Sequence, residues 1–113
     1  MRLHEIARFV ADVPATTAFY RTLLGSEPLH ADEGLAIFMQ DGVQIFIHRT
    51  YTPGPDDLPP ENHLAFAVDD VDAACARLVG EGLTIAMPAA DYYWGRSAYL
   101  RAPDGQLIEL IAT

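Results

Sequence analysis

Two polar residues occupy strand-like segments that should otherwise be apolar. Glu109 lies within Leu107–Ile111, where a buried carboxylate without a partner is costly, so a metal ion or a donor must lie beside it. His63 begins a segment in which the residues on its own face, Ala65 and Ala67, are both small. That face therefore offers a ligand-capable imidazole with space around it.

Glu5 adds a second carboxylate, because strand alternation places it on one face with Ala7 and Phe9. One histidine and two carboxylates facing a cavity are suited to a divalent metal such as Mn²⁺, Fe²⁺, Zn²⁺ or Ni²⁺. A metal-free alternative stays open, in which Glu5 is a structural carboxylate hydrogen-bonded to His63.

Three further residues are predicted to line the same cavity. A hairpin turn at residues 104–105 places Tyr99 roughly opposite Glu109, which makes the two cross-strand neighbours. Phe46 and His48 share one face of an earlier strand by the same alternation. We expect all three to contact a substrate.

An aromatic segment with a nearby arginine is the remaining candidate for ligand binding. Tyr92, Tyr93 and Trp94 can stack on a cationic aromatic ligand, or they can form a packed loop over the cavity mouth. Arg96 can neutralise an anionic substrate, or it can belong to a surface salt bridge.

The elements that would position these residues occur twice along the chain. Residues 5–13 resemble residues 63–71, and each segment ends in an aspartate, Asp12 or Asp70, that is suited to capping a helix. The predicted helices span residues 13–24 and 71–79, and each is followed by glycine.

The predicted order is βαβββ, repeated once, which is an α+β fold of mixed sheets enclosing a cavity. The predicted strands span residues 3–11, 27–32, 34–40, 43–49, 62–68, 83–88, 96–102 and 106–112. We expect one domain over 1–113, made of modules 1–50 and 62–113 and a proline-rich linker 51–61. The modules can pair within one chain or be exchanged between chains, and we expect a homodimer.

Composition narrows the classes of partner. The 113 residues suffice for one core, and the net charge of −9 argues against nucleic acid and anionic membranes but allows cationic small molecules. No apolar run reaches the roughly 18–20 residues that span a bilayer. With the single cysteine Cys75 and no apolar leader, a cytoplasmic location is expected.

Arg8 falls on the face of its predicted strand that should pack against a helix, which suggests that it reaches a dimer interface or an acidic partner.

Three segments carry a resemblance to a known family. These segments are residues 12–25, 63–71 and 94–110, and together they resemble the vicinal-oxygen-chelate superfamily of glyoxalases, bleomycin-resistance proteins and dioxygenases. In its metal-dependent members, the first and last strands of each half supply the ligands. The resemblance places those ligands at Glu5, Phe46, His63 and Glu109, of which Phe46 cannot bind a metal.

The resemblance is less specific for the reaction, because this fold hosts many activities. Glyoxalase I-like enzymes fill all four ligand positions, so Phe46 argues against that activity. Fosfomycin-resistance transferases use three ligands, but they have histidine at the position of Glu5 and threonine at the position of Ala7. Extradiol dioxygenases are larger and fit less well.

Two functions follow from these observations. The first is a glyoxalase-like lyase or isomerase using Mn, Fe, Zn, Ni or Co, in which the metal chelates a small oxygenated substrate and stabilises an enediolate or oxyanion. Glu5 or Glu109 would act as the base, and Tyr99 would orient or protonate the substrate. The second is a metal-free, bleomycin-resistance-like dimer that binds a cationic aromatic drug in a groove, with Trp94 as a stacking platform.

Overall fold

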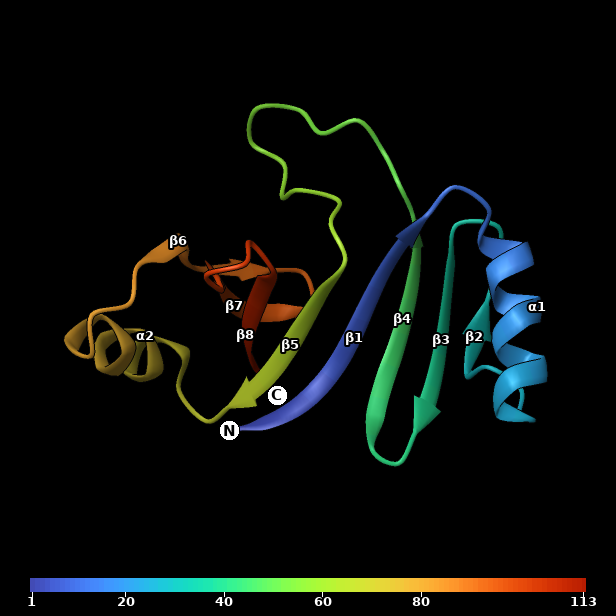
Figure 1. Ribbon diagram of the computed structural model, residues 1–113, viewed down its shortest axis with the longest axis horizontal. Coiled ribbons are helices and arrows are strands. Elements are labelled where there is room, and N and C mark those ends of the chain that lie inside the picture. The colour runs from blue at the N-terminus through green and yellow to red at the C-terminus, as the bar shows by residue number, and fades with distance from the viewer. The chain divides into compact units, whose positions relative to one another are not determined.

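Eight strands and two helices follow the repeated βαβββ order, which confirms the predicted α+β fold. The computed structural model describes residues 1–113 (Figure 1). The strands are β1 (Arg2–Val10), β2 (His30–Ala31), β3 (Leu35–Gln40), β4 (Val43–Arg49), β5 (His63–Val68), β6 (Ile85–Tyr92), β7 (Gly95–Arg101) and β8 (Leu107–Ala112), and the helices are α1 (Val13–Leu24) and α2 (Val71–Gly80). Neither helix is long and apolar enough to cross a bilayer.

The chain divides into two units. The N-terminal unit spans residues 5–62, and the C-terminal unit combines residues 63–113 with residues 1–4. The proline-rich segment 51–61 thus belongs to the N-terminal unit, and β1 contributes its first residues to one unit and its remaining residues to the other.

In the N-terminal unit the strand order is β2-β3-β4-β1, with β1 parallel to β4 and the other pairs antiparallel. Helix α1 packs on β3 and β4 (Figure 1). The core consists of fully buried residues from the helix and these strands, namely Val13, Ala36, Phe38 and Ile47. Alternation along β3 and β4 therefore gives the helix an apolar face to cover.

The predicted helix caps are confirmed, and a tight turn joins β3 to β4. Asp12 accepts a hydrogen bond from the Ala15 amide at 3.0 Å, and Asp70 accepts one from the Ala73 amide at 3.0 Å. The turn between β3 and β4 has positive φ at both central positions, 51° at Asp41 and 81° at Gly42. Such a turn matches the twist of the two strands, and aspartate followed by glycine tolerates it.

Arg8 has a contact within the N-terminal unit. It pairs with Ile47 in the ladder between β1 and β4, and so lies on the side that α1 covers. Its Nη1 donates to the Tyr20 hydroxyl of α1 at 3.2 Å, while its buried Nε has no partner. The hydrogen bond to Tyr20 therefore gives Arg8 a polar partner within the unit.

In the C-terminal unit the order is β5-β8-β7-β6, with β5 parallel to β8 and the other pairs antiparallel. Helix α2 packs on β6, β7 and β8 (Figure 1). The ladder places Ala65 and Tyr99 on either side of Glu109, which confirms that Tyr99 and Glu109 are cross-strand neighbours. Paired residues of neighbouring strands share a face, so these three side chains project together.

Two strands differ from their predicted bounds by more than one residue. Strand β2 has two residues instead of six, and Pro28 in the predicted range has no amide hydrogen to donate to a ladder. Strand β6 extends to Tyr92 instead of ending at 88, because Tyr92 pairs with Gly95 across a two-residue loop. Its register also shifts on both sides of Met87.

Candidate metal centre

Glu109 is the centre of a polar cluster in the C-terminal unit. Its side chain is 4% exposed, and its Oε1 lies 3.1 Å from Nε2 of His63, which is itself 10% exposed. Its Oε2 accepts a hydrogen bond from the hydroxyl of the fully buried Ser97 at 2.7 Å. Both carboxylate oxygens therefore have partners, and the cost of burying the charge is offset.

The sheet determines which side chains meet at Glu109. Strand β8 lies between β5 and β7, so its side chains have a neighbour on each side. His63 comes from β5, while Ser97 and Tyr99 are separated by one residue on β7 and share a face. Small residues on β5, including Ala65 directly beside Glu109, leave the carboxylate space to reach His63.

A tryptophan extends this cluster outward. Tyr93 and Trp94 form the tip of the β6–β7 hairpin, and Trp94 Nε1 donates to Ser97 Oγ at 3.1 Å. An indole nitrogen only donates, so the Ser97 hydroxyl hydrogen is left for Glu109. The resulting chain of hydrogen bonds has one direction, from Trp94 through Ser97 to Oε2 of Glu109, which accepts.

Aromatic rings surround the same residues. Tyr92 and Trp94 are stacked, with centroids 4.5 Å apart and planes inclined by 1°. Tyr99 is 3% exposed and contacts Tyr92 and His63 edge-on. Burial, and then the negative charge of Glu109, raises the pKa of Tyr92, so its hydroxyl stays protonated at neutral pH.

The arrangement of His63 and Glu109 fits a divalent cation. Two ligand atoms with metal bonds of about 2.1 Å, at right or tetrahedral angles, lie about 3.0–3.4 Å apart. The distance of 3.1 Å between His63 Nε2 and Glu109 Oε1 falls within that range. These two side chains could therefore bind a metal with little rearrangement.

Glu5, Phe46 and His48 belong to the N-terminal unit. Glu5 is half-buried and pairs with Gln44, so it lies on the sheet face of Phe46 and His48, not on the face covered by α1. The rings of Phe46 and His48 are stacked at 5.8 Å, and His48 Nδ1 lies 2.7 Å from the Arg49 carbonyl oxygen. The roles of these three residues in a site remain predictions.

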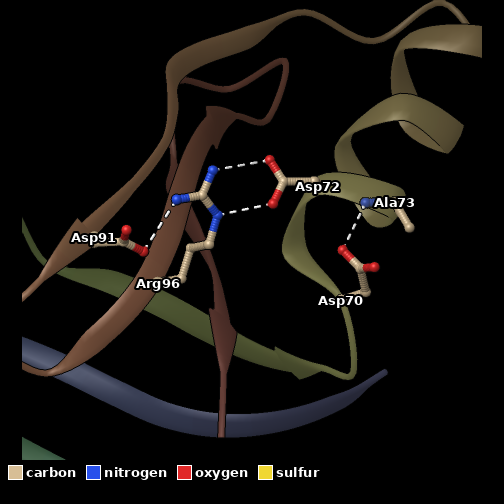
Figure 2. A network of polar contacts seen from close by, with 5 residues as sticks. All are labelled: Asp70, Asp72, Ala73, Asp91 and Arg96. Atoms are coloured by element: carbon tan, nitrogen blue, oxygen red, sulfur yellow. Dashed lines mark hydrogen bonds and ion pairs between the residues drawn. The ribbon is translucent and has the colours of Figure 1, made fainter.

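Arg96 lies outside the Glu109 cluster. Alternation along β7 places Arg96 on the face opposite Ser97, towards α2. Its guanidinium forms two hydrogen bonds with Asp72, at 2.8 and 3.0 Å, and one with Asp91 at 3.0 Å (Figure 2). Arg96 thus forms surface salt bridges, and its contact with a substrate stays a prediction.

We expect Arg96→Gln to lower the melting temperature modestly at pH 7. Hydrogen bonding to Arg96 lowers the pKa of Asp72 below its ordinary 3.8, so the pair stabilises the fold above that pH and the benefit is lost as pH falls through the lowered pKa. The effect is small because both partners are solvated. Melting curves at pH 7 and pH 3 test this, with exposed Arg77→Gln as control. If Arg96→Gln lowered the melting temperature equally at both pH values, the predicted pH dependence would be wrong.

Sequence reasoning missed two members of the C-terminal unit. Ser97 was not singled out, although its position two residues before Tyr99 already places it on the Glu109 face. His4 was not singled out either, and its Nδ1 is buried without a hydrogen-bond partner. Burial, and then the positive charge of Arg2, lowers the pKa of His4, while the charge of Glu109 acts in the opposite direction. His4 thus lies within electrostatic reach of the cluster.

Comparisons with known proteins agree with this architecture. The uncharacterized protein YaeR of Escherichia coli is 32% identical, over 96% of this chain and 94% of that protein. The lactoylglutathione lyase of Salmonella typhimurium is 30% identical, over 96% and 90%. A structure of a methylmalonyl-CoA epimerase variant from Streptomyces coelicolor, in complex with 2-nitronate-propionyl-CoA, aligns with a TM-score of 0.67 at 26% identity, covering 100% of this chain and 97% of that one.

The model of the Glyoxalase/Bleomycin resistance protein/Dioxygenase superfamily matches almost the whole chain, from residue 2 to residue 110. The match includes both βαβββ modules and therefore His63, Ser97 and Glu109. The protein belongs to the glyoxalase/bleomycin resistance protein/dioxygenase superfamily.

Proposed function

We propose that this protein is a divalent-metal-dependent enzyme of the lyase or isomerase type that acts on a small oxygenated substrate. The observation that carries the proposal is the buried pair of Glu109 and His63, whose Oε1 and Nε2 are 3.1 Å apart. That separation suits a hydrogen bond, and it also matches two ligands on one cation; carboxylate and imidazole are both ligands that divalent metals accept.

Glu5 is the proposed third ligand. Its side chain is half-buried, and the family resemblance assigns a ligand to its position. The family resemblance assigns the fourth position to Phe46, which has no ligand atom. Three protein ligands leave a coordination position for substrate, as in catalytic rather than structural metal sites.

Each side chain then has a task in the reaction. A metal held by these residues would supply a Lewis acid for the oxygens of the substrate. As the base, Glu5 would leave its coordination of the metal and accept a proton from the substrate carbon next to those oxygens. Tyr99, buried opposite Glu109, orients the substrate or returns a proton. Ser97 holds the Glu109 carboxylate in place through its hydrogen bond to Oε2.

The relatives support the reaction class. One is a lactoylglutathione lyase, and a structural neighbour at 26% identity is a methylmalonyl-CoA epimerase. Lyase and epimerase reactions at one oxygenated carbon are therefore the activities to screen first. We expect the protein to be a homodimer in solution.

A second candidate function rests on the hairpin tip. Tyr93 is 93% exposed and Trp94 is 37% exposed, and the chain has a net charge of −9. Exposed aromatic rings on an acidic protein attract cationic aromatic molecules. The alternative is a metal-free protein that sequesters such a molecule in a dimer groove.

Metal content separates the two functions. The protein would be purified without metal-affinity steps, analysed by elemental mass spectrometry, and reloaded with Mn²⁺, Fe²⁺, Co²⁺, Ni²⁺ or Zn²⁺. We expect near-stoichiometric metal in the wild type and its loss in His63→Ala. The matched control is His30→Ala, because His30 is exposed and bonds Asp32 far along the chain from the site. A wild type that takes up none of these metals would refute the metal-dependent enzyme and favour the drug-binding function.

A further inference from the structure

We infer that Ser97, ordered by Trp94, is a positioning residue that restricts Glu109 to binding the metal through a single oxygen. This inference deepens the proposed function and rests on it. Its basis is the chain of hydrogen bonds from Trp94 Nε1 to Ser97 Oγ, at 3.1 Å, and from Ser97 Oγ to Glu109 Oε2, at 2.7 Å.

The two oxygens of Glu109 have different surroundings. Oε1 faces His63 Nε2 at 3.1 Å, which places it towards the proposed cation. Oε2 faces Ser97, whose side chain is completely buried, so bulk solvent cannot compete for the bond. A short hydrogen bond from a hydroxyl to a carboxylate is among the stronger ones in proteins. Oε2 is therefore held away from the cation, and Glu109 would bind through Oε1 alone.

Trp94 determines the direction of the serine hydroxyl. Ser97 Oγ can donate one hydrogen and can accept others. Since Trp94 Nε1 donates to that oxygen, the lone pair on this side is used and the hydroxyl hydrogen is available only for Glu109. Stacking of Trp94 on Tyr92, at 4.5 Å and 1°, keeps the indole nitrogen in place.

This chain also links the centre to the surface. Trp94 is 37% exposed at the hairpin tip, while Ser97 and Glu109 are buried. It is the only tryptophan in the sequence. Its fluorescence should therefore respond when a metal polarises Glu109 and strengthens or weakens the two hydrogen bonds.

The test measures the affinity of the stripped protein for Zn²⁺, by titration against a chelator, in the wild type and three variants. Ser97→Ala should weaken binding by about 10–100-fold, the usual effect of removing a partner that orients a ligand. Ser97→Thr keeps the hydroxyl and should restore affinity towards the wild-type value. Trp94→Phe keeps a ring against Tyr92 but loses the N–H donor. Its affinity for Zn²⁺ should therefore lie between that of Ser97→Ala and that of the wild type.

Two readouts distinguish positioning from a general effect on folding. With Co²⁺, the visible absorption bands should change in Ser97→Ala, because the freed Oε2 can turn towards the metal. Addition of Zn²⁺ should change Trp94 fluorescence in the wild type and much less in Ser97→Ala. Melting curves of the metal-free proteins record any loss of stability separately, and if Ser97→Ala does not fold, Trp94→Phe carries the test.

Each outcome decides the question. Wild-type affinity and an unchanged Co²⁺ spectrum in Ser97→Ala would overturn the positioning role but leave the metal-dependent function intact. The same holds if Ser97→Ala loses stability without losing affinity. A wild type that binds neither Zn²⁺ nor Co²⁺ would overturn both proposals together.

Discussion

Glu109→Gln should lower the affinity for Zn²⁺ or Mn²⁺ by at least about 100-fold, more than the loss of an orienting partner causes. The amide that replaces the carboxylate is neutral and has one oxygen instead of two. That oxygen can face His63 or accept from Ser97, whereas the carboxylate does both, at 3.1 and 2.7 Å. Any lyase or epimerase activity should disappear with the metal. Calorimetric titration of the stripped protein measures the change directly.

The matched control for this experiment is Glu81→Gln. Glu81 is exposed at the C-terminal end of α2, so the same change of charge occurs away from the cluster. We expect its metal affinity to equal that of the wild type. If Glu109→Gln still bound metal as tightly as Glu81→Gln, the carboxylate would not be a ligand, and its burial would have to be explained by hydrogen bonding alone.

Phe38→Ala should lower the free energy of unfolding by about 3–5 kcal/mol. Phe38 is fully buried in the core beneath α1, where it packs with Val13 and Ile47 and lies 6.0 Å from the ring of Tyr20. Removing the ring takes away buried apolar surface and leaves a cavity that the rigid sheet cannot close. Because small domains are stable by only about 5–15 kcal/mol, much of the protein should be unfolded at moderate urea concentrations.

The neighbouring residue provides the control. Met39 follows Phe38 on β3, points to the other face and is 45% exposed. Met39→Ala should change the free energy of unfolding by about 0.5 kcal/mol or less, as is usual at exposed positions. Urea unfolding followed by circular dichroism measures both variants. Equal losses in the two would mean that the core under α1 contributes little to stability.

The elements set by local chemistry were predictable from the sequence. Asp12 and Asp70 cap their helices through their own side chains, and the turn at residues 41–42 requires a positive φ that aspartate and glycine allow. These features depend on residues a few positions apart, so pattern and spacing suffice to find them. The helix predicted at 13–24 is identical to α1, and the one at 71–79 ends one residue early.

Strand ends were less predictable, because they depend on pairing with distant residues. Strand β6 continues to Tyr92 only because Gly95 and the following residues of β7 return beside it. Nothing in the local sequence of residues 89–92 distinguishes a strand from a loop. Similarly, β2 is limited to the two residues that find partners on β3.

The alternation of side chains along a strand predicted one part of the candidate site. A second part was overlooked, although the same alternation predicts it. The pairing of Tyr99 with Glu109 was predicted from one hairpin turn. Counting back two residues from Tyr99 reaches Ser97 on the same face, and counting three reaches Arg96 on the opposite one. Alternation therefore already assigned Ser97 to the cluster and Arg96 to the side of α2. What it could not give is the hydrogen bond from Trp94, which requires the fold of the hairpin tip.

The irregular form of β6 has a consequence for the behaviour of the protein at high concentration. This strand is last in the order of its sheet, its register shifts on both sides of Met87, and Pro88 lacks an amide hydrogen. A straight outer strand would offer a continuous row of unpaired backbone groups on which another chain could add a strand. At β6 that row is interrupted, so copies of the protein cannot readily extend one another's sheets into fibres along this edge.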